Sequence, residues 1–92
     1  MKQVRWSLLK SRRLKRTRGI SFEEIIQAKF LGIHRNPSRD NQMVLAYEYK
    51  GYVWAVPYVF ESEGIFLKTI YPSRKLKKIY KDRRRDEKNK IN

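Results

Sequence analysis

The chain has 92 residues, of which 23 are Lys or Arg and 9 are Asp or Glu, so its formal net charge is +14. This length suits one small domain and excludes a multidomain enzyme with a large substrate cleft. The absence of cysteine excludes a disulfide framework, a thiol nucleophile and a cysteine-based zinc site.

No stretch of the sequence has the pattern of a membrane segment. The longest apolar stretch, residues 52–60, is far shorter than the roughly 20 residues that a membrane-spanning helix needs. No apolar segment follows the basic N-terminus, as a signal peptide would require. We therefore expect a cytoplasmic protein with no membrane partner.

The charge is concentrated at the two ends of the chain. Residues 1–18 carry eight basic and no acidic side chains, and residues 69–92 carry ten basic and three acidic ones. The middle of the chain is nearly neutral, with five basic and six acidic side chains. Such segregation is typical of a protein that binds a polyanion, most commonly nucleic acid. The alternative is that the basic ends only keep the fold soluble.

The first third of the chain predicts a short strand and two helices. The strand covers residues 2–6, and the first helix covers residues 7–18, which are rich in long side chains that favour helices. Gly19 suits the left-handed position that ends such a helix. Ser21, with a Glu three residues later, forms a capping box that begins the second helix. We expect this helix to end at Leu31 and to pack its apolar face on a sheet.

The centre of the chain predicts strands. After a loop at residues 32–42, strands are expected at residues 43–49, 52–60 and 65–71. Two short turns join them, so they should form an antiparallel meander. Pro57 cannot donate a hydrogen bond to a ladder, so we expect it at a sheet edge or in a bulge.

The end of the chain predicts a short helix that Ser73 can cap. The sequence beyond Asp82 is basic and polar, so we expect one domain over residues 1–82 and a disordered tail over residues 83–92. The order strand, helix, helix, three strands, helix predicts an α+β fold. Its two N-terminal helices should pack on a small antiparallel sheet.

The segment that joins the last strand to the last helix holds the residues best suited to RNA cleavage. Attack by the 2′-hydroxyl of RNA needs a base, a cation for the charged phosphorane and an acid for the leaving oxygen. Basic and phenolic side chains can supply these where neighbouring cations lower a Lys or Tyr pKa, and Arg74 can clamp the phosphate. The alternative is a surface patch that only binds phosphate. The candidate catalytic residues are Arg74, Lys75, Tyr80, Tyr71 and Lys68.

His34 is the only histidine and a candidate general acid or base, because the ordinary pKa of imidazole lies near neutrality. The alternative is an exposed loop histidine. A lone histidine without companion ligands does not form a metal site, and we expect neither a metal nor a cofactor. The side chains expected to bind RNA are Arg12, Arg13, Lys15, Arg16, Arg35, Arg39, Lys77, Lys78 and Lys81.

Two stretches of the sequence resemble the BrnT family of bacterial toxins. Trp6, then Leu14, then RGISFEE at residues 18–24 is similar to the N-terminal signature of that family. The chain departs from the family pattern at Ser7, where an Asp often follows the Trp.

The closing segment of the resemblance is residues 68–75, which end in Ser-Arg-Lys. It is similar to the SxRKA-type segment of the family, although Leu76 replaces the usual small residue. The resemblance spans residues 4–81.

The family is similar in fold to the RelE/ParE toxin superfamily. The resemblance implies a toxin of a two-gene toxin–antitoxin pair, a metal-independent endoribonuclease that inhibits translation. It implies that Arg74, Lys75 and Tyr80 match positions used in cleavage. It also implies a hetero-oligomer with a cognate antitoxin, which we expect to be acidic and DNA-binding, and an RNA substrate that is free or bound to the ribosome.

Three other functions remain open at this point. A non-catalytic binder, including a toxin relic that only pairs with its antitoxin, would bind nucleic acid with a steep salt dependence and no strand scission. A ParE-like gyrase inhibitor would damage DNA replication and leave RNA intact. A structural ribosome-associated protein would share the basic composition but not the RGISFEE stretch.

Overall fold

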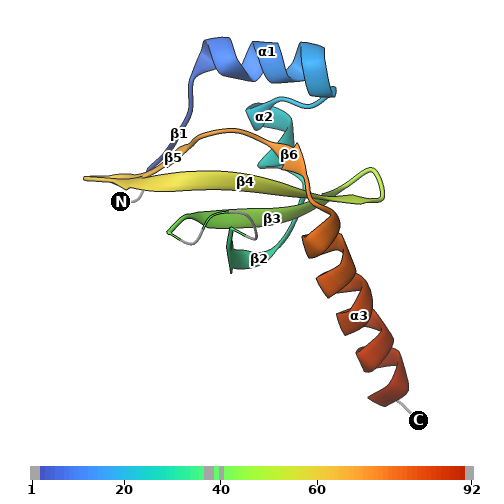
Figure 1. The fold of residues 1–92 in the computed structure, drawn as a ribbon. Helices are drawn as coiled ribbons and strands as arrows, with labels where there is room; N and C mark the ends of the chain where they lie inside the picture. Colours follow the sequence, from blue (N-terminus) through green and yellow to red (C-terminus); the bar gives the residue numbers. More distant parts are fainter. Residues whose placement is uncertain (1–2, 37–38, 40, 91–92) are drawn as a thin grey trace.

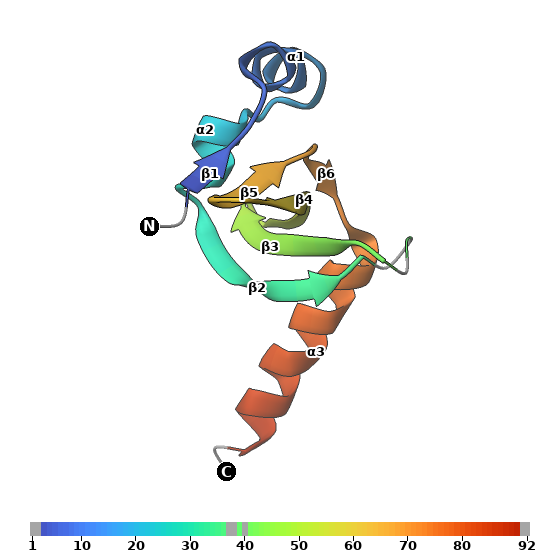
Figure 2. The ribbon, with the colours of Figure 1, turned by 90° about the vertical axis from the view of Figure 1, so that its left-hand side faces the viewer.

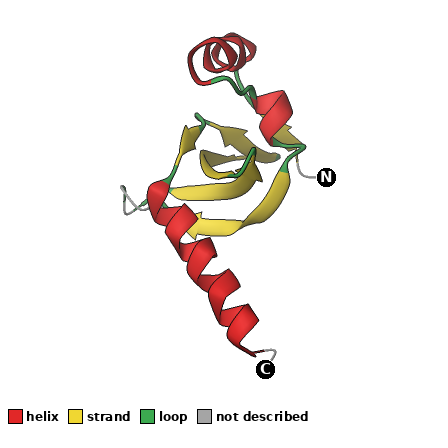
Figure 3. Ribbon diagram, turned by 90° about the vertical axis from the view of Figure 1, so that its right-hand side faces the viewer, coloured by secondary structure: helices red, strands yellow, loops and turns green. Residues whose placement is uncertain are grey.

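Figure 1 shows the computed structural model, which describes residues 3–36, 39 and 41–90. Within this part of the chain, the elements in order are β1 (Gln3–Arg5), α1 (Leu8–Arg18), α2 (Phe22–Ile25), β2 (Lys29–Arg35), β3 (Met43–Tyr49), β4 (Tyr52–Glu61), β5 (Gly64–Leu67), β6 (Tyr71–Pro72) and α3 (Arg74–Lys90). The described strands form one sheet, with α1 and α2 on one side of it and α3 on the other (Figure 2 and Figure 3). The α+β class is confirmed.

The sheet is mixed, which corrects the prediction of an antiparallel one. Its strand order is β1-β5-β4-β3-β2, and β6 pairs with β4 beside β5. The predicted meander of β3, β4 and β5 is confirmed as antiparallel. Strand β1, however, pairs with β5 in parallel, because the chain crosses the molecule between them instead of turning back.

The turn between β3 and β4 is confirmed at Lys50 and Gly51. Both residues have positive φ angles, 50° and 75°, which is the combination that a two-residue type I′ turn requires. Glycine adopts this conformation at low cost, and the tight turn pairs Tyr49 directly with Tyr52.

Helix α1 begins and ends where the sequence predicts. The Ser7 hydroxyl accepts a hydrogen bond from the Lys10 amide at 3.2 Å and caps the first turn. Gly19, at φ 77°, takes the left-handed position, and its amide donates to the Lys15 carbonyl. Both ends are therefore fixed by local hydrogen bonds.

Helix α2 is one turn long, so the prediction that it extends to Leu31 is wrong. Its capping box, made by Ser21 and Glu24, is confirmed. The chain then forms strand β2. Residues 32–35, predicted as part of a loop, therefore belong to a strand. The reason is pairing with β3, in which Phe30 lies opposite Tyr47 and the two rings meet edge-on at 5.4 Å.

Pro57 lies inside the sheet and not at an edge or bulge, so that prediction is also wrong. It pairs with Val44 of β3, and on its other side its carbonyl accepts a hydrogen bond from the Lys68 amide. In an antiparallel strand the N–H and the C=O of one residue point to the same side. An N–H at position 57 would therefore point, like the Pro57 carbonyl, to the space between β5 and β6. Residues 68–70, predicted as strand, leave the ladder at this point, so no ladder bond is lost.

Each face of the sheet has its own core, because successive side chains of a strand point to opposite faces. On the face toward α1 and α2 the buried side chains are Leu14, Ile20, Phe22, Ile25, Leu45, Tyr47, Val56, Tyr58, Leu67 and Ile70. On the face toward α3 they are Val44, Ala46, Val53, Ala55 and Leu76.

Helix α3 begins as predicted but runs further. The Ser73 hydroxyl caps it by accepting a hydrogen bond from the Leu76 amide at 3.2 Å, and Leu76 anchors the first turn in the core. The helix then projects away from the sheet to Lys90, past the predicted end at Asp82 (Figure 1). Residues 91–92 of the predicted tail lie outside the described residues. None of the helices described is long and apolar enough to span a membrane.

Candidate functional site

The RGISFEE stretch is a structural element. The Arg18 guanidinium donates to the Ile70 carbonyl, which ties the end of α1 to the segment after β5. The Glu23 carboxylate accepts hydrogen bonds from the Ser11 hydroxyl and from the Trp6 indole, the latter at 3.1 Å. The bond from Ser11 contributes most to lowering the pKa of Glu23, and the bond from Trp6 lowers it further. The stretch therefore joins α1, α2 and the segment after β5, and these contacts give Arg18 and Glu23 a structural role.

The five predicted catalytic residues do not form one site. Lys68 and Tyr71 line a hollow on the β5–β6 side of the sheet, whereas Arg74 lines a different hollow on α3. Lys75 is exposed on the first turn of α3, and Tyr80 faces strand β2. Lys68 and Arg74 are separated because the chain leaves the ladder after Lys68 and then turns into a helix, whereas Tyr71 and Tyr80 both pack against the buried cluster on the face toward α3. We call the first of these hollows the Tyr71 hollow; it is lined by Lys10, Asn36, Arg39, Gln42, Pro57, Lys68, Thr69 and Tyr71.

His34 and Tyr80 are brought together, although they are 46 residues apart in sequence. His34 lies in β2 on the face toward α3, so it is a partly buried strand residue and not an exposed loop residue. Its Nε2 atom is hydrogen-bonded to the Tyr80 hydroxyl. The two rings meet edge-on, with centroids 5.3 Å apart and planes at 87°. We call these two residues the His34–Tyr80 pair.

Arg83 is the cation beside this pair. Its guanidinium lies 5.1 Å from the centre of the Tyr80 ring, a cation–π contact. Burial, and then the charge of Arg83, lower the pKa of His34 below its ordinary value of 6.5. The imidazole is therefore neutral at pH 7. Arg83 is not among the residues predicted for the site, because the sequence predicts a disordered tail from residue 83 onward. Its spacing of three from Tyr80, on a longer helix, is the signal that indicates it.

Gly32 makes room for the pair. A Cβ atom at this position would lie 2.8 Å from the Tyr80 hydroxyl and 3.6 Å from His34 Nε2. Its φ of 157° lies at the end of the range that side chains rarely adopt. The irregularity in the β2 ladder falls between Phe30 and Gly32, two residues before His34.

One side of α3 collects positive charge around a hollow of about 470 Å³. The Lys77 ammonium lies 4.2 Å above the centre of the Tyr52 ring, and Asp82 is the acidic side chain among the lining residues. The first turn of α3 has no acidic residue, although carboxylates are favoured at a helix N-terminus. This concentration of cations suits an anionic ligand. We call it the cationic face of α3; it comprises Arg74, Lys77, Lys78 and Lys81.

The other predicted RNA-binding residues lie elsewhere. Arg12, Arg13 and Arg16 are exposed on α1, whereas Lys15 is hydrogen-bonded to Glu24 at 2.8 Å. Helices α1 and α3 lie on opposite sides of the sheet, in a molecule about 48 Å long (Figure 1). The two basic ends of the sequence therefore form two separate surfaces. Arg35 and Arg39 are exposed near the turn after β2.

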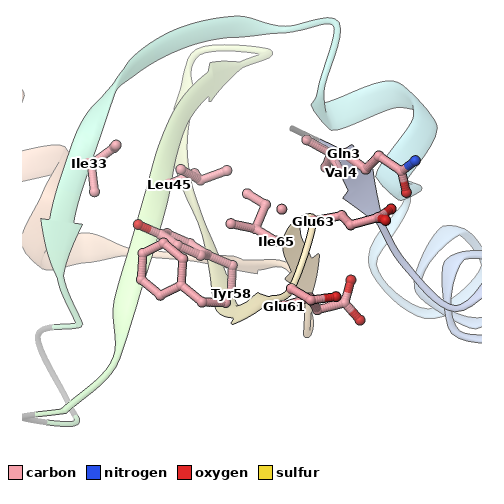
Figure 4. A pocket seen from close by; sticks show the side chains of 11 residues that line it. Gln3, Val4, Ile33, Leu45, Tyr58, Glu61, Glu63 and Ile65 are labelled. Atoms are coloured by element: carbon pink, nitrogen blue, oxygen red, sulfur yellow. The ribbon is translucent and has the colours of Figure 1, made fainter. Parts of the chain in front are cut away.

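A third hollow, of about 880 Å³, is lined by apolar side chains and by Gln3, Glu61, Ser62 and Glu63, and it lies on the opposite side of the sheet from α3. Figure 4 shows Ile33 of β2 facing Val4 and Ile65 across it. Phe60, which also lines it, is 78% exposed, and Glu61 stands at the turn beside it. Its walls come from five strands, so no local pattern in the sequence indicates this hollow.

Among the described residues, no group of three or more His, Cys, Asp or Glu side chains is placed to hold a metal ion. Comparison with protein-family models, with curated proteins and with solved structures finds no match for this chain.

Proposed function

We propose that this chain is an RNA-cleaving toxin of a toxin–antitoxin pair that inhibits translation and is neutralised by a protein partner. The observation that carries the proposal is the His34–Tyr80 pair with Arg83 beside it. A neutral imidazole, a phenol and a guanidinium are the base, the acid and the cation that attack by a 2′-hydroxyl needs. The family resemblance and the charge of +14 are consistent with it.

The proposed reaction uses only side chains of this chain. His34 takes the proton of the 2′-hydroxyl as its oxygen attacks the adjacent phosphorus, and Arg83 stabilises the charge that builds on the phosphorane. Tyr80 gives its phenolic proton to the 5′-oxygen as the P–O bond breaks. The products are a 2′,3′-cyclic phosphate and a 5′-hydroxyl end. Because His34 and Tyr80 are hydrogen-bonded, the proton can then pass back from imidazole to phenolate.

The cationic face of α3 would hold the RNA backbone on the same helix as the pair. With 3.6 residues per turn, this face lies on the side of α3 opposite to Leu76, Tyr80 and Arg83, so a bound RNA would have to pass around the helix to reach His34. Phosphate contacts of this kind position a nucleic acid without reading its sequence. Arg74 and Lys75, matched by the resemblance to cleavage, serve binding in this proposal.

A protein partner is supported by the exposed apolar surface. Phe60, Ile33 and Val4 are 78%, 56% and 47% exposed around the hollow of Figure 4. Contiguous exposed apolar surface commonly marks a site of protein association. An acidic segment of the same partner would complement the cationic face of α3 and exclude RNA from it.

The test is to map new RNA 5′ ends in a cell-free translation extract dosed with the wild-type chain or with His34→Gln. We expect new 5′-hydroxyl ends with the wild type and a loss of about 10²- to 10⁴-fold with the variant, the range for removal of a general base. Repeating the assay on the same RNA without ribosomes shows whether they are required. Intact RNA throughout, with a folded wild-type chain, would refute the enzyme.

A non-catalytic nucleic-acid binder is the second candidate. It is favoured by the placement of Arg74 and Lys75 away from Lys68 and Tyr71, which leaves the motif residues without a common centre. In that case the His34–Tyr80 pair only docks α3 on β2. RNA would then bind with a steep salt dependence and remain uncut.

A further inference from the structure

The Tyr71 hollow has a concentration of positive charge that the proposed function does not use. Lys10 of α1, Arg39 of the β2–β3 turn and Lys68 after β5 all line it. These side chains come from three segments that are distant in sequence, so they are not the solvated face of one helix. No described acidic residue is among its lining residues. Converging cations repel one another, and an anion bound between them would remove that cost.

The floor of the hollow is ordered by hydrogen bonds. Asn36 is only 8% exposed, and its Oδ1 atom accepts a hydrogen bond from the Tyr71 hydroxyl at 3.2 Å. Its Nδ2 atom donates to Gln42 Oε1 at 2.7 Å, which closes the turn between β2 and β3. Burial raises the pKa of Tyr71, and the charge of the nearby Arg39 offsets part of this rise. The polar floor is therefore held in place before any ligand arrives.

Lys68 is restrained as well. Its ammonium lies 5.7 Å from the centre of the Phe66 ring, and its amide is bonded to the Pro57 carbonyl at 2.8 Å. The hydroxyl-bearing Thr69 follows it in the lining. The hollow thus offers ammonium, guanidinium and hydroxyl donors around one space of about 340 Å³. This volume is at the lower end of the range for small-ligand sites.

The shape and charge favour a terminal phosphate over one within a chain. A phosphodiester carries one negative charge and continues on both sides, so it suits an open surface such as the cationic face of α3. A phosphate monoester carries close to two negative charges at pH 7 and ends in a free group that can enter a hollow. Hydrogen bonds from charged donors are also the strongest available to it.

We propose that the Tyr71 hollow binds a terminal phosphate, either the 5′-phosphate end of a nucleic acid or free inorganic phosphate. The inference does not depend on RNA cleavage, because a phosphate can bind here whether or not the His34–Tyr80 pair acts on RNA.

The probes are two fluorescent 2′-O-methyl RNA oligonucleotides of one sequence, one with a 5′-phosphate and one with a 5′-hydroxyl. Methylation removes the nucleophile, so scission cannot affect the result. We expect the 5′-phosphorylated probe to bind about tenfold more tightly at equal ionic strength, the size of one or two charge-assisted hydrogen bonds. Lys10→Met and Lys68→Met should each reduce this preference. Lys81→Met, on the cationic face of α3, should weaken both probes and keep their ratio.

Inorganic phosphate distinguishes the two sources. The ligand is free phosphate if three results hold. The two probes bind with equal affinity, phosphate raises the melting temperature of the wild type above its value in chloride of equal ionic strength, and Lys68→Met abolishes this rise. If the probes bind alike and phosphate gives no such rise, the proposal is wrong. Either result leaves the cleavage proposal to its own test.

Discussion

The protonation state of His34 is determined by the burial of its ring and by the positive charge of Arg83 beside it. Both disfavour the charged imidazolium and lower the pKa of His34 below 6.5. The same surroundings that keep it a neutral base at pH 7 also make its protonation unfavourable for the fold. Protonation of His34 therefore affects both the proposed chemistry of the site and the stability of the fold.

Stability should fall as the pH drops through the window that begins at 6.5. The unfolded chain takes up the His34 proton near pH 6.5, whereas the folded chain takes it up only at its lower pKa, so protonation favours unfolding. We expect the urea midpoint to be lower at pH 5.5 than at pH 7.5, and the difference to shrink in His34→Gln. Glu23 and Glu24, whose pKa values are lowered from 4.5, act only at lower pH. An unchanged difference in the variant would contradict this account.

Glu23 is a second residue whose contacts give a direct prediction. Glu23→Ala should lower the free energy of unfolding by about 1–3 kcal/mol, because the Ser11 hydroxyl, 2% exposed, loses its acceptor. The matched control is Glu61→Ala, which removes only a surface ion pair to Arg5 at 3.5 Å and should cost less than about 1 kcal/mol. Equal urea midpoints for the two variants would show that Glu23 does not hold α1.

The strands and helices show how far pairing between distant segments overrides local preference. The caps at Ser21 and Ser73 and the Lys50–Gly51 turn could be predicted, because each depends on neighbours within four residues. Strand β2 could not be predicted, because its register is set by its pairing with β3, and no local pattern in the sequence indicates this pairing. The parallel pairing of β1 with β5 is not predictable for the same reason. The continuation of α3 past Asp82 differs from the expectation because residues 83–90, basic and polar in composition, are helical.

The β1–β5 seam depends on Gly64. A Cβ atom there would lie 1.8 Å from the Gln3 carbonyl oxygen, so Gly64→Ala must displace β1. We expect a loss of about 1–3 kcal/mol and faster hydrogen exchange of the Gln3 amide, which donates to the Glu63 carbonyl at 2.8 Å. Ser62→Ala in the same turn is the control and should leave that exchange unchanged. A protected Gln3 amide in Gly64→Ala would rule out the tight seam.

Across the whole molecule, the basic ends of the sequence become two surfaces on opposite sides of the sheet. The charge segregation correctly indicated basic surfaces, but not that the fold would separate them. The candidate site was likewise only partly predictable. His34 and Tyr80 were each singled out for their chemistry, yet their contact across 46 residues depends on the docking of α3.

Two separate surfaces should contribute independently to binding of a long RNA. Neutralising three cations on α1 (Arg12, Arg13 and Arg16 to Gln) should lower the slope of log K against log salt by about 2, near 0.7 per phosphate contact on a single strand. Neutralising Lys77, Lys78 and Lys81 on α3 should lower it by a similar amount, and the two sets should add. If either set alone abolished the salt dependence, one surface would account for all binding.

The most direct test of the central claim is the single-turnover cleavage rate of a purified RNA by the wild type and by Tyr80→Phe. Tyr52→Phe is the matched control, because Tyr52 lies on the cationic face side of α3 and away from His34. We predict 5′-hydroxyl products from the wild type and the control, and a rate lower by about 10²-fold or more in Tyr80→Phe, with RNA affinity and melting temperature retained. Equal rates for Tyr80→Phe and the wild type would contradict the assignment of the His34–Tyr80 pair to catalysis.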